Sequence, residues 1–177
     1  MKNEGPWKER DNPLRAGREE PPRPQAGGKE RDRRWMALAL REAERALEED
    51  EVPVGCVVVR GENLLGKAHN QVERLRDPTA HAEILALTQA AAALDDPRLT
   101  GCELFVTLEP CFMCAGACVL ARLDRVVFAA RDPKFGGCGS LLDVPATPGL
   151  NHVLQVEQGP LGEEAATLLK AFFRGRR

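Results

Sequence analysis

The stretch "CELFVTLEPCFMCAGACVLAR", residues 102–122, predicts a buried strand that leads into a buried helix. Its first part, residues 102–108, is rich in β-branched and aromatic side chains, which favour strands. From residue 111 onward it is apolar on all sides, which is typical of a helix without a solvent-facing side. Pro110 suits the first turn of this helix, because the N–H that proline lacks would find no partner there. The segment therefore favours a fold of alternating strands and helices.

The sequence on either side of this stretch supplies the remaining elements. Runs of β-branched residues predict strands, and apolar residues at helical spacing predict helices. Further strands are expected at residues 52–60, 64–70, 125–130 and 152–157, and further helices at residues 36–47, 80–94 and 161–172. This order predicts an α/β fold, a three-layer α/β/α sandwich around a mixed five-stranded sheet.

The chain divides into an arm, residues 1–34, and a single domain, residues 35–177. The arm combines several prolines and alternating charges with almost no aliphatic residues. Such a composition buries too little apolar surface to offset the entropy lost on ordering, so we expect the arm to be disordered. The remainder is long enough for one domain with a sizeable core and too short for two.

Composition limits the classes of function. The formal net charge is −2, whereas a typical nucleic-acid-binding domain is strongly basic. The N-terminus lacks the apolar region of a signal peptide, and no apolar run approaches the roughly 20 residues that span a bilayer. We therefore expect a cytoplasmic protein without a membrane partner. In that compartment the six cysteines are metal ligands, catalytic groups or packed side chains rather than disulfides.

Cys111 and Cys114 are the first candidates for chemistry. Three residues apart at a helix start, they share one helix face, so both sulfurs can reach one ion. The helix N-terminus also favours the thiolate form. A redox pair of the thioredoxin type sits in the same position after a strand, and two packed thiols would give the same pattern. The pair alone leaves metal binding, redox chemistry and packing open.

A metal site needs further ligands, and His81 is the best placed of the three histidines. It lies at the start of the helix near residues 80–94, and Glu83 follows two residues later. His69 and His152 are expected to be surface or packing residues. Because residues two apart do not share a helix face, Glu83 should stand beside the metal and contact a bound water. His81, Cys111 and Cys114 with an open fourth position describe a catalytic zinc site, whereas Cys118 as a fourth ligand would make a structural zinc module.

The order His81-Ala82-Glu83, followed by Pro110-Cys111-x-x-Cys114, is the signature of zinc-dependent nucleobase deaminases. The segments "EVPVGCVVV", "HNQ", "DPTAHAEILAL", "LFVTLEPCFMCAGA", "RVVFAARDPKFGGCGSLLDV" and "NHV" extend the similarity from about residue 35 to residue 176. In this order and spacing the chain resembles the bacterial tRNA-specific adenosine deaminase (TadA) family of cytidine/deoxycytidylate deaminase-like enzymes. The zinc motif by itself is shared with deaminases of free cytidine or guanine nucleosides and nucleotides, which remain an alternative.

The resemblance implies a cytidine deaminase-like fold, a homodimer and one Zn²⁺ per subunit. It implies hydrolytic deamination of adenosine to inosine at wobble position 34, in a tRNA anticodon loop where a base flips out of its stack most easily. Zinc would lower the pKa of a bound water from about 15.7 towards 7, and the resulting hydroxide would attack C6 of adenine. Glu83 would then carry protons to the ring N1 and to the departing ammonia.

The resemblance also implies a set of residues that bind the RNA. Asn70 and Ala82 would contact the base, the Gly-rich loop would meet flanking nucleotides, and the C-terminal helix would clasp RNA. The expected substrate-binding residues are Asn70, Ala82, Asp132, Lys134, Phe135, Phe173 and Arg174. The sequence departs from the family pattern at His69, Cys118 and Cys138.

Overall fold

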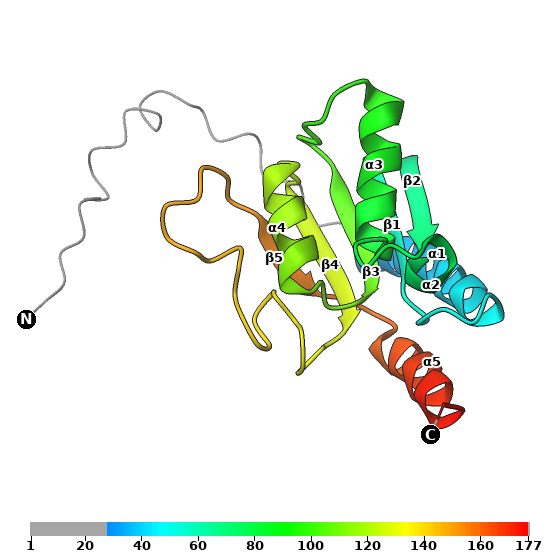
Figure 1. Ribbon diagram of the computed structural model, residues 1–177. Coiled ribbons are helices and arrows are strands. Elements are labelled where there is room, and N and C mark those ends of the chain that lie inside the picture. The colour runs from blue at the N-terminus through cyan, green and yellow to red at the C-terminus, as the bar shows by residue number, and fades with distance from the viewer. Residues whose placement is uncertain (1–27, 177) are drawn as a thin grey trace, which may run out of the picture.

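The computed structural model describes residues 28–176, which contain one five-stranded sheet (Figure 1). The strands are β1 (Gly55–Arg60), β2 (Asn63–His69), β3 (Glu103–Leu108), β4 (Arg125–Ala130) and β5 (Gln155–Gln158). Their order in the sheet is β2-β1-β3-β4-β5. β1 runs antiparallel to both of its neighbours, whereas β3, β4 and β5 run parallel. The predicted mixed sheet of five strands is confirmed.

Helices cover both faces of this sheet (Figure 1). The helices are α1 (Lys29–Glu48), α2 (Val72–Leu75), α3 (Ala82–Leu94), α4 (Phe112–Leu120) and α5 (Gly162–Arg174). α1 and α5 share one apolar core with the sheet, and α3 and α4 share the other. The predicted three-layer α/β/α arrangement is therefore confirmed. No helix formed by residues 28–176 is long and apolar enough to span a bilayer.

Alternation along the strands creates the two cores. Val57 and Val59 of β1 pack with α1, whereas Cys56 and Val58 pack with α3 and α4. Side chains two apart point to the same face of a strand, and a sheet covered on both faces has apolar residues at every position. The continuous apolar run in residues 52–60 follows from this double coverage.

Two glycines bring the helices into direct contact with the hairpin of β1 and β2. A Cβ at Gly55 would lie 2.0 Å from the carbonyl oxygen of Ala39 in α1. A Cβ at Gly66 would lie 2.4 Å from the carbonyl oxygen of Ala86 in α3. Only glycine permits such close approach of two backbones. Gly66 thereby fixes the position of α3, the helix that His81 caps.

α1 begins at Lys29, earlier than the helix start expected near residue 36. Arg31 pairs with Glu103, N···O 2.7 Å, and Asp32 pairs with the buried Arg125, N···O 2.6 Å. These ion pairs reach the sheet, so residues that look like part of a polar arm extend the helix instead. The rest of the expected arm, residues 1–27, lies outside the described residues.

The last strand begins at Gln155 rather than at His152. Its partner β4 begins at Arg125, which pairs with Gln155, so the preceding residues have no strand beside them. His152 is half-buried and its ring contacts the carbonyl oxygen of Leu123, in agreement with the packing role expected for it.

Candidate metal centre

Two helix N-termini meet on the face of the sheet covered by α3 and α4. His81 is the capping residue of α3 and Cys111 is the capping residue of α4. Both have extended backbones, with φ −70° and ψ 152° at His81 and φ −67° and ψ 171° at Cys111. Cys111 follows the carboxyl end of β3, the usual location of sites in α/β folds. Both helix dipoles favour negative charge at this point.

The structure brings the three expected ligands together. Nδ1 of His81 lies 3.7 Å from Sγ of Cys111 and 3.5 Å from Sγ of Cys114. The three ligand atoms all lie within 4.8 Å of one another. Bond lengths of about 2.3 Å to sulfur and about 2.0–2.1 Å to nitrogen at a tetrahedral angle place N and S about 3.5 Å apart. The geometry fits a zinc ion held by Nδ1 and two thiolates.

Glu83 lies at the start of α3, next to this group. Because His81 is the cap and Glu83 is in the first helical turn, the two side chains leave backbones of different conformation. This explains locally how residues two apart can belong to one site. Glu83 is only 4% exposed, although it is an acid near a helix start. A glutamate whose only role was to face solvent in the first helical turn would be exposed, so the burial of Glu83 indicates another role.

The surroundings of Glu83 shift the pKa of its carboxyl. Burial raises the pKa of its carboxyl above the ordinary value, and the nearby charge of Cys111 acts in the same direction. His81 and a hydrogen bond with Cys114 oppose this shift without reversing it. A carboxyl with a raised pKa can both accept and return a proton at moderate pH, which general acid–base chemistry requires.

The two thiols differ in acidity. A hydrogen bond from Cys114, with help from His81, lowers the pKa of Cys111 to about 4. The same bond, together with burial, raises the pKa of the Cys114 thiol. One thiolate is therefore formed readily, and the second forms as a metal displaces its proton.

Cys118 does not complete a four-ligand site. It is buried one turn further along α4 and lies outside the group whose ligand atoms converge. Within residues 28–176, His81, Cys111 and Cys114 form the single group with metal-binding geometry. All six cysteines are free. With an imidazole beside both sulfurs, this arrangement favours a three-ligand metal site over a structural module or a redox pair.

Asn70 is buried beside the start of α3. It follows β2, and the backbone N–H of the next residue, Gln71, donates to Ala80, N···O 3.0 Å. Its side-chain amide donates to the carboxylate of Glu51, N···O 3.0 Å. Ala82, at the first position of α3, is fully buried. Asn70 and Ala82 thus both lie near His81 in the folded structure.

The Gly-rich loop after β4 lies against the start of α4. The N–H of Gly137 donates to the carbonyl of Pro110, N···O 2.7 Å, and Gly136 pairs with Cys111. The Asp132 carboxylate accepts the N–H groups of Lys134 and Phe135, so this side chain shapes the turn. Lys134 and Phe135 are exposed, the latter by 58%.

The end of α5 lies near the loop between α1 and β1. Arg176 pairs with Asp50, N···O 2.8 Å, which directly precedes the Glu51 that binds Asn70. Phe173 and Arg174 are exposed, whereas Phe172 is buried. The structure therefore brings the C-terminal helix to the edge of the site without contacts from Phe173 or Arg174 to the metal ligands.

Glu51 and Glu109 are two residues of the site that the sequence analysis did not single out. Both are buried acids, 1% and 2% exposed, without a local sequence pattern that predicts burial. The available signal was position, because Glu109 interrupts an apolar run just before Pro110 and Cys111.

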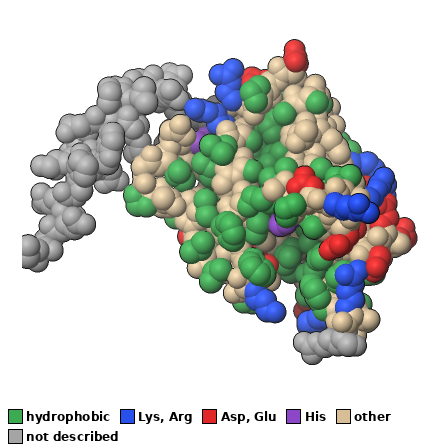
Figure 2. Space-filling model, viewed as in Figure 1, with side chains coloured by type: hydrophobic (Ala, Val, Ile, Leu, Met, Phe, Trp, Pro, Cys, Tyr) green, Lys and Arg blue, Asp and Glu red, His purple; other side chains and the backbone are tan. Residues whose placement is uncertain are grey.

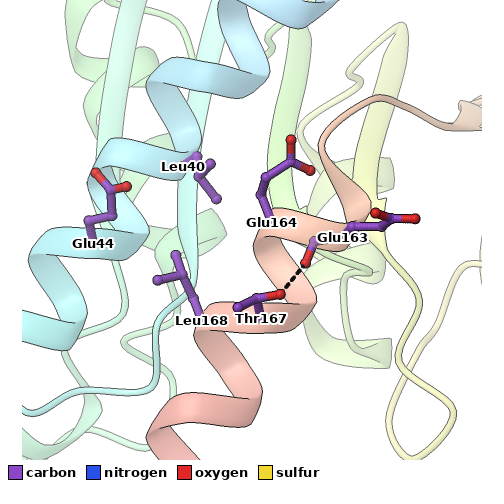
Figure 3. A pocket seen from close by; sticks show the side chains of 6 residues that line it. All are labelled: Leu40, Glu44, Glu163, Glu164, Thr167 and Leu168. Carbon is purple, nitrogen blue, oxygen red and sulfur yellow. Dashed lines mark hydrogen bonds between the residues drawn. The ribbon is translucent and has the colours of Figure 1, made fainter.

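A hollow elsewhere on the molecule carries no comparable chemistry. It lies between α1 and α5, on the opposite face of the sheet, and Leu40, Glu44, Glu163, Glu164, Thr167 and Leu168 line it (Figure 3). Its three carboxylates would repel phosphates, and no imidazole or thiol reaches it. We assign it no role.

Apolar side chains gather on the face that carries α4 and the loop after β4 (Figure 2). The exposed members on α4 and the following loops are Phe112, Leu120, Phe135, Leu141, Leu142 and Val153. Leu120 and Val153 are exposed by 83% and 74%. Patches of this kind mark interaction surfaces.

Comparison with known proteins places this geometry in a family. The model of the cytidine and deoxycytidylate deaminase zinc-binding region matches residues 29–130. A tRNA-specific adenosine deaminase from Aquifex aeolicus is 51% identical over 140 residues, which are 79% of this chain and 92% of the relative.

Solved structures resemble the same region. One, from a study of A-to-I editing by tRNA:A34 deaminases at the wobble position of transfer RNA, has a TM-score of 0.75 at 42% identity, covering 77% of this chain and 99% of that one. A guanine deaminase from Nitrosomonas europaea has a TM-score of 0.68 at 29% identity, covering 78% of this chain and 82% of that one.

Proposed function

We propose that this chain, which belongs to the tRNA-specific adenosine deaminase family among the cytidine and deoxycytidylate deaminases, converts adenosine to inosine at wobble position 34 of a tRNA anticodon loop. The reaction consumes one water and releases ammonia. The observation that carries this proposal is the convergence of His81, Cys111 and Cys114 beside the buried Glu83.

His81, Cys111 and Cys114 would hold one Zn²⁺ per subunit, with the fourth position open. When bound, the ion supplies Lewis acidity that makes water a nucleophile near neutral pH. The donor set of one imidazole and two thiols suits zinc better than magnesium or calcium, which prefer oxygen ligands. The ligands' place at two helix N-termini stabilises the negative charge of the thiolates.

Glu83 would act as the proton carrier of the reaction. Its carboxylate takes a proton from the attacking water and delivers it to N1 of the adenine ring. It then helps to protonate the amino group at C6, which leaves as ammonia while the carbonyl of inosine forms. Proton transfer by a positioned side chain contributes roughly 10²–10⁴-fold in rate. Burial of Glu83 supports this role, because it raises the pKa of the carboxyl towards the working pH.

Other residues would orient the RNA. Asn70 and Ala82, next to the start of α3, would contact the flipped base. Asp132, Lys134 and Phe135 on the loop, together with Phe173 and Arg174 on α5, would meet flanking nucleotides. The exposure of Lys134 and Phe135 supports this, since a cation can pair with phosphate and an aromatic ring can stack on a base. Asp132 would act through the shape of its turn.

The proposed active form is a cytoplasmic homodimer, without a membrane partner. The apolar side chains exposed on α4 and the following loops support dimer formation, because a second copy would remove them from water. Phe112 directly follows Cys111, so a partner subunit that covers it would border the metal centre. tRNA as the substrate supports a cytoplasmic location.

A second candidate is deamination of free guanine. The similarity to the guanine deaminase from Nitrosomonas europaea favours it, since the zinc-binding chemistry is common to both reactions.

Comparative assays separate the two candidates. The purified zinc-loaded protein would be incubated with an anticodon stem-loop carrying adenosine at position 34, and with free adenosine, guanine and cytidine. We expect inosine in the stem-loop and little product from the free compounds. A stem-loop with guanosine at position 34 is the matched control. Deamination of free guanine, together with a stem-loop that keeps its adenosine, would overturn the tRNA assignment.

A further inference from the structure

Glu109 is a buried acid whose backbone is fixed to the sheet. It lies between the end of β3 and Pro110, two residues before Cys111, and is 2% exposed. Its N–H donates to the carbonyl of Ala130 at the end of β4, N···O 2.8 Å. The side chain therefore starts from a rigid point at the carboxyl edge of the parallel strands.

The Glu109 carboxylate binds both ends of the Gly-rich loop. Oε1 accepts the backbone N–H groups of Cys138, 3.1 Å, and Ser140, 3.0 Å. Oε2 accepts the N–H of Asp132, 3.1 Å, and the hydroxyl of Ser140. No salt bridge to Glu109 occurs within residues 28–176, so these hydrogen bonds are what stabilise the buried carboxylate. Hydrogen bonds to a charged group are the strong ones.

The loop that Glu109 binds also packs on the start of α4 without room to shift. A Cβ at Gly137 would lie 2.7 Å from the backbone N and Cα of Phe112. A Cβ at Gly136 would lie 2.6 Å from the carboxyl carbon of Glu109 itself. The loop and the start of α4 therefore form one unit, and Lys134 and Phe135 project from it between the two anchored ends.

We propose that Glu109 is a positioning residue whose carboxylate holds residues 132–140 in register with Cys111, so that Lys134 and Phe135 meet the nucleotides that flank the target adenosine. Glu109 lies outside the group of side chains that could hold a metal, and its carboxylate is occupied by the loop. The role in RNA binding rests on the proposed function, whereas the role in holding the loop does not.

The test compares Glu109→Gln with the wild type in the zinc-loaded full chain. The glutamine keeps the shape but turns an NH₂ group towards one pair of donors, where a carboxylate oxygen accepted both. We expect amide hydrogen exchange in residues 132–140 to accelerate by about tenfold or more. The loss of a hydrogen bond to a charged group makes local opening of the loop more frequent by at least this factor. Exchange in α3 and zinc content should stay at wild-type levels.

Kinetics separate positioning from a direct catalytic role. Contacts with flanking nucleotides act in the ground state and the transition state alike, so Glu109→Gln should raise KM for the stem-loop by about tenfold and change kcat much less. The same substitution at the exposed Glu164, Glu164→Gln, is the matched control and should change neither value. Unchanged loop exchange, or a fall in kcat at constant KM, would overturn the proposal.

A milder variant keeps the test decisive if Glu109→Gln does not fold. Ser140→Ala removes one hydroxyl donor and leaves the three N–H donors, so it should raise loop exchange and KM in the same direction by about two- to fivefold. Wild-type values for Ser140→Ala in that case would contradict the proposal. Absence of stem-loop deamination by the wild type would refute the proposed function alone, because the exchange measurement still reports on the loop.

Discussion

The side-chain amide of Asn70 donates to the buried carboxylate of Glu51, N···O 3.0 Å. The other oxygen of Glu51 accepts the backbone N–H of Arg74, 2.8 Å, so the carboxylate is held from two sides. This arrangement distinguishes the NH₂ group of the Asn70 amide from its oxygen. The NH₂ group faces Glu51, and the amide oxygen remains as the acceptor that a base could use.

Asn70→Asp tests this relationship. It preserves the shape and places a second carboxylate beside that of Glu51 in a buried setting, where like charges repel strongly. We expect kcat/KM for the stem-loop to fall by more than about tenfold, with zinc content unchanged. Asn63→Asp, at the exposed start of β2, is the control for the same chemical change. A wild-type kcat/KM for Asn70→Asp would remove Asn70 from substrate binding.

Replacement of Glu83 should separate metal binding from catalysis. Glu83→Ala and Glu83→Gln keep all three ligands, so the protein should retain its zinc. Because the proton carrier is gone, we expect kcat to fall by at least about 10²–10⁴-fold. Metal analysis and inosine formation in the stem-loop measure the two effects on one preparation. Appreciable turnover by either variant would contradict the role of Glu83.

Cysteine replacements should show which thiols hold the metal. Cys111→Ala removes a ligand. Loss of a residue that only supports a ligand already lowers metal affinity by about 10–100-fold, so the zinc content of Cys111→Ala should fall to near zero after dialysis. Cys118→Ala leaves the ligand group complete and should keep one zinc per subunit. The two variants control for each other, since one deletes the thiol of the α4 cap and the other deletes a thiol within α4. Loss of zinc from Cys118→Ala would mean that the site is a four-ligand, structural one.

The fold and the convergence of His81, Cys111 and Cys114 could be predicted because their signals are local. Apolar runs and helical spacing predicted the layers, and the spacing of Cys111 and Cys114 after Pro110 placed both thiols at a helix start. His81 needed the observation that a histidine and an acid lie together near another helix start. That His81 is the cap of α3 rather than a residue of its first turn was visible only in the structure.

Glu51, Glu109 and the true start of α1 could not be predicted, because their partners are distant in sequence. Glu109 is defined by donors 23 to 31 residues away. Asp32 lies in a stretch with the composition of a disordered arm, yet its partner Arg125 is 93 residues further along the chain. Long-range ion pairs leave no periodic pattern, so a polar residue that is buried by them looks like a surface residue.

Arg125 should be essential for stability. It is 2% exposed and binds the carboxylates of Asp32, Glu103 and Glu157. Burial lowers the pKa of its guanidinium, but these hydrogen bonds outweigh burial and raise it. Arg125→Met would remove the buried cation that the buried carboxylates of Asp32 and Glu103 share, and it should lower the free energy of unfolding by about 3–5 kcal/mol. Urea unfolding measures this, with the exposed Arg98→Met as the control, which should change stability little.

The same ion pairs predict how stability depends on pH. Hydrogen bonds from Arg125 lower the pKa of Glu157 below its ordinary value. A carboxyl with a lowered folded pKa stabilises the protein above its unfolded pKa, about 4.3, and this contribution is lost as the pH falls through the folded pKa. The wild type should therefore exceed Glu157→Gln in urea midpoint at pH 7 and pH 5. The difference should shrink progressively from about pH 4 downward, because protonated Glu157 is as neutral as glutamine.

Glu164→Gln, at an exposed position, should give a difference that does not change with pH. A constant gap between the wild type and Glu157→Gln from pH 7 to about pH 3 would show that Glu157 contributes by packing rather than by charge.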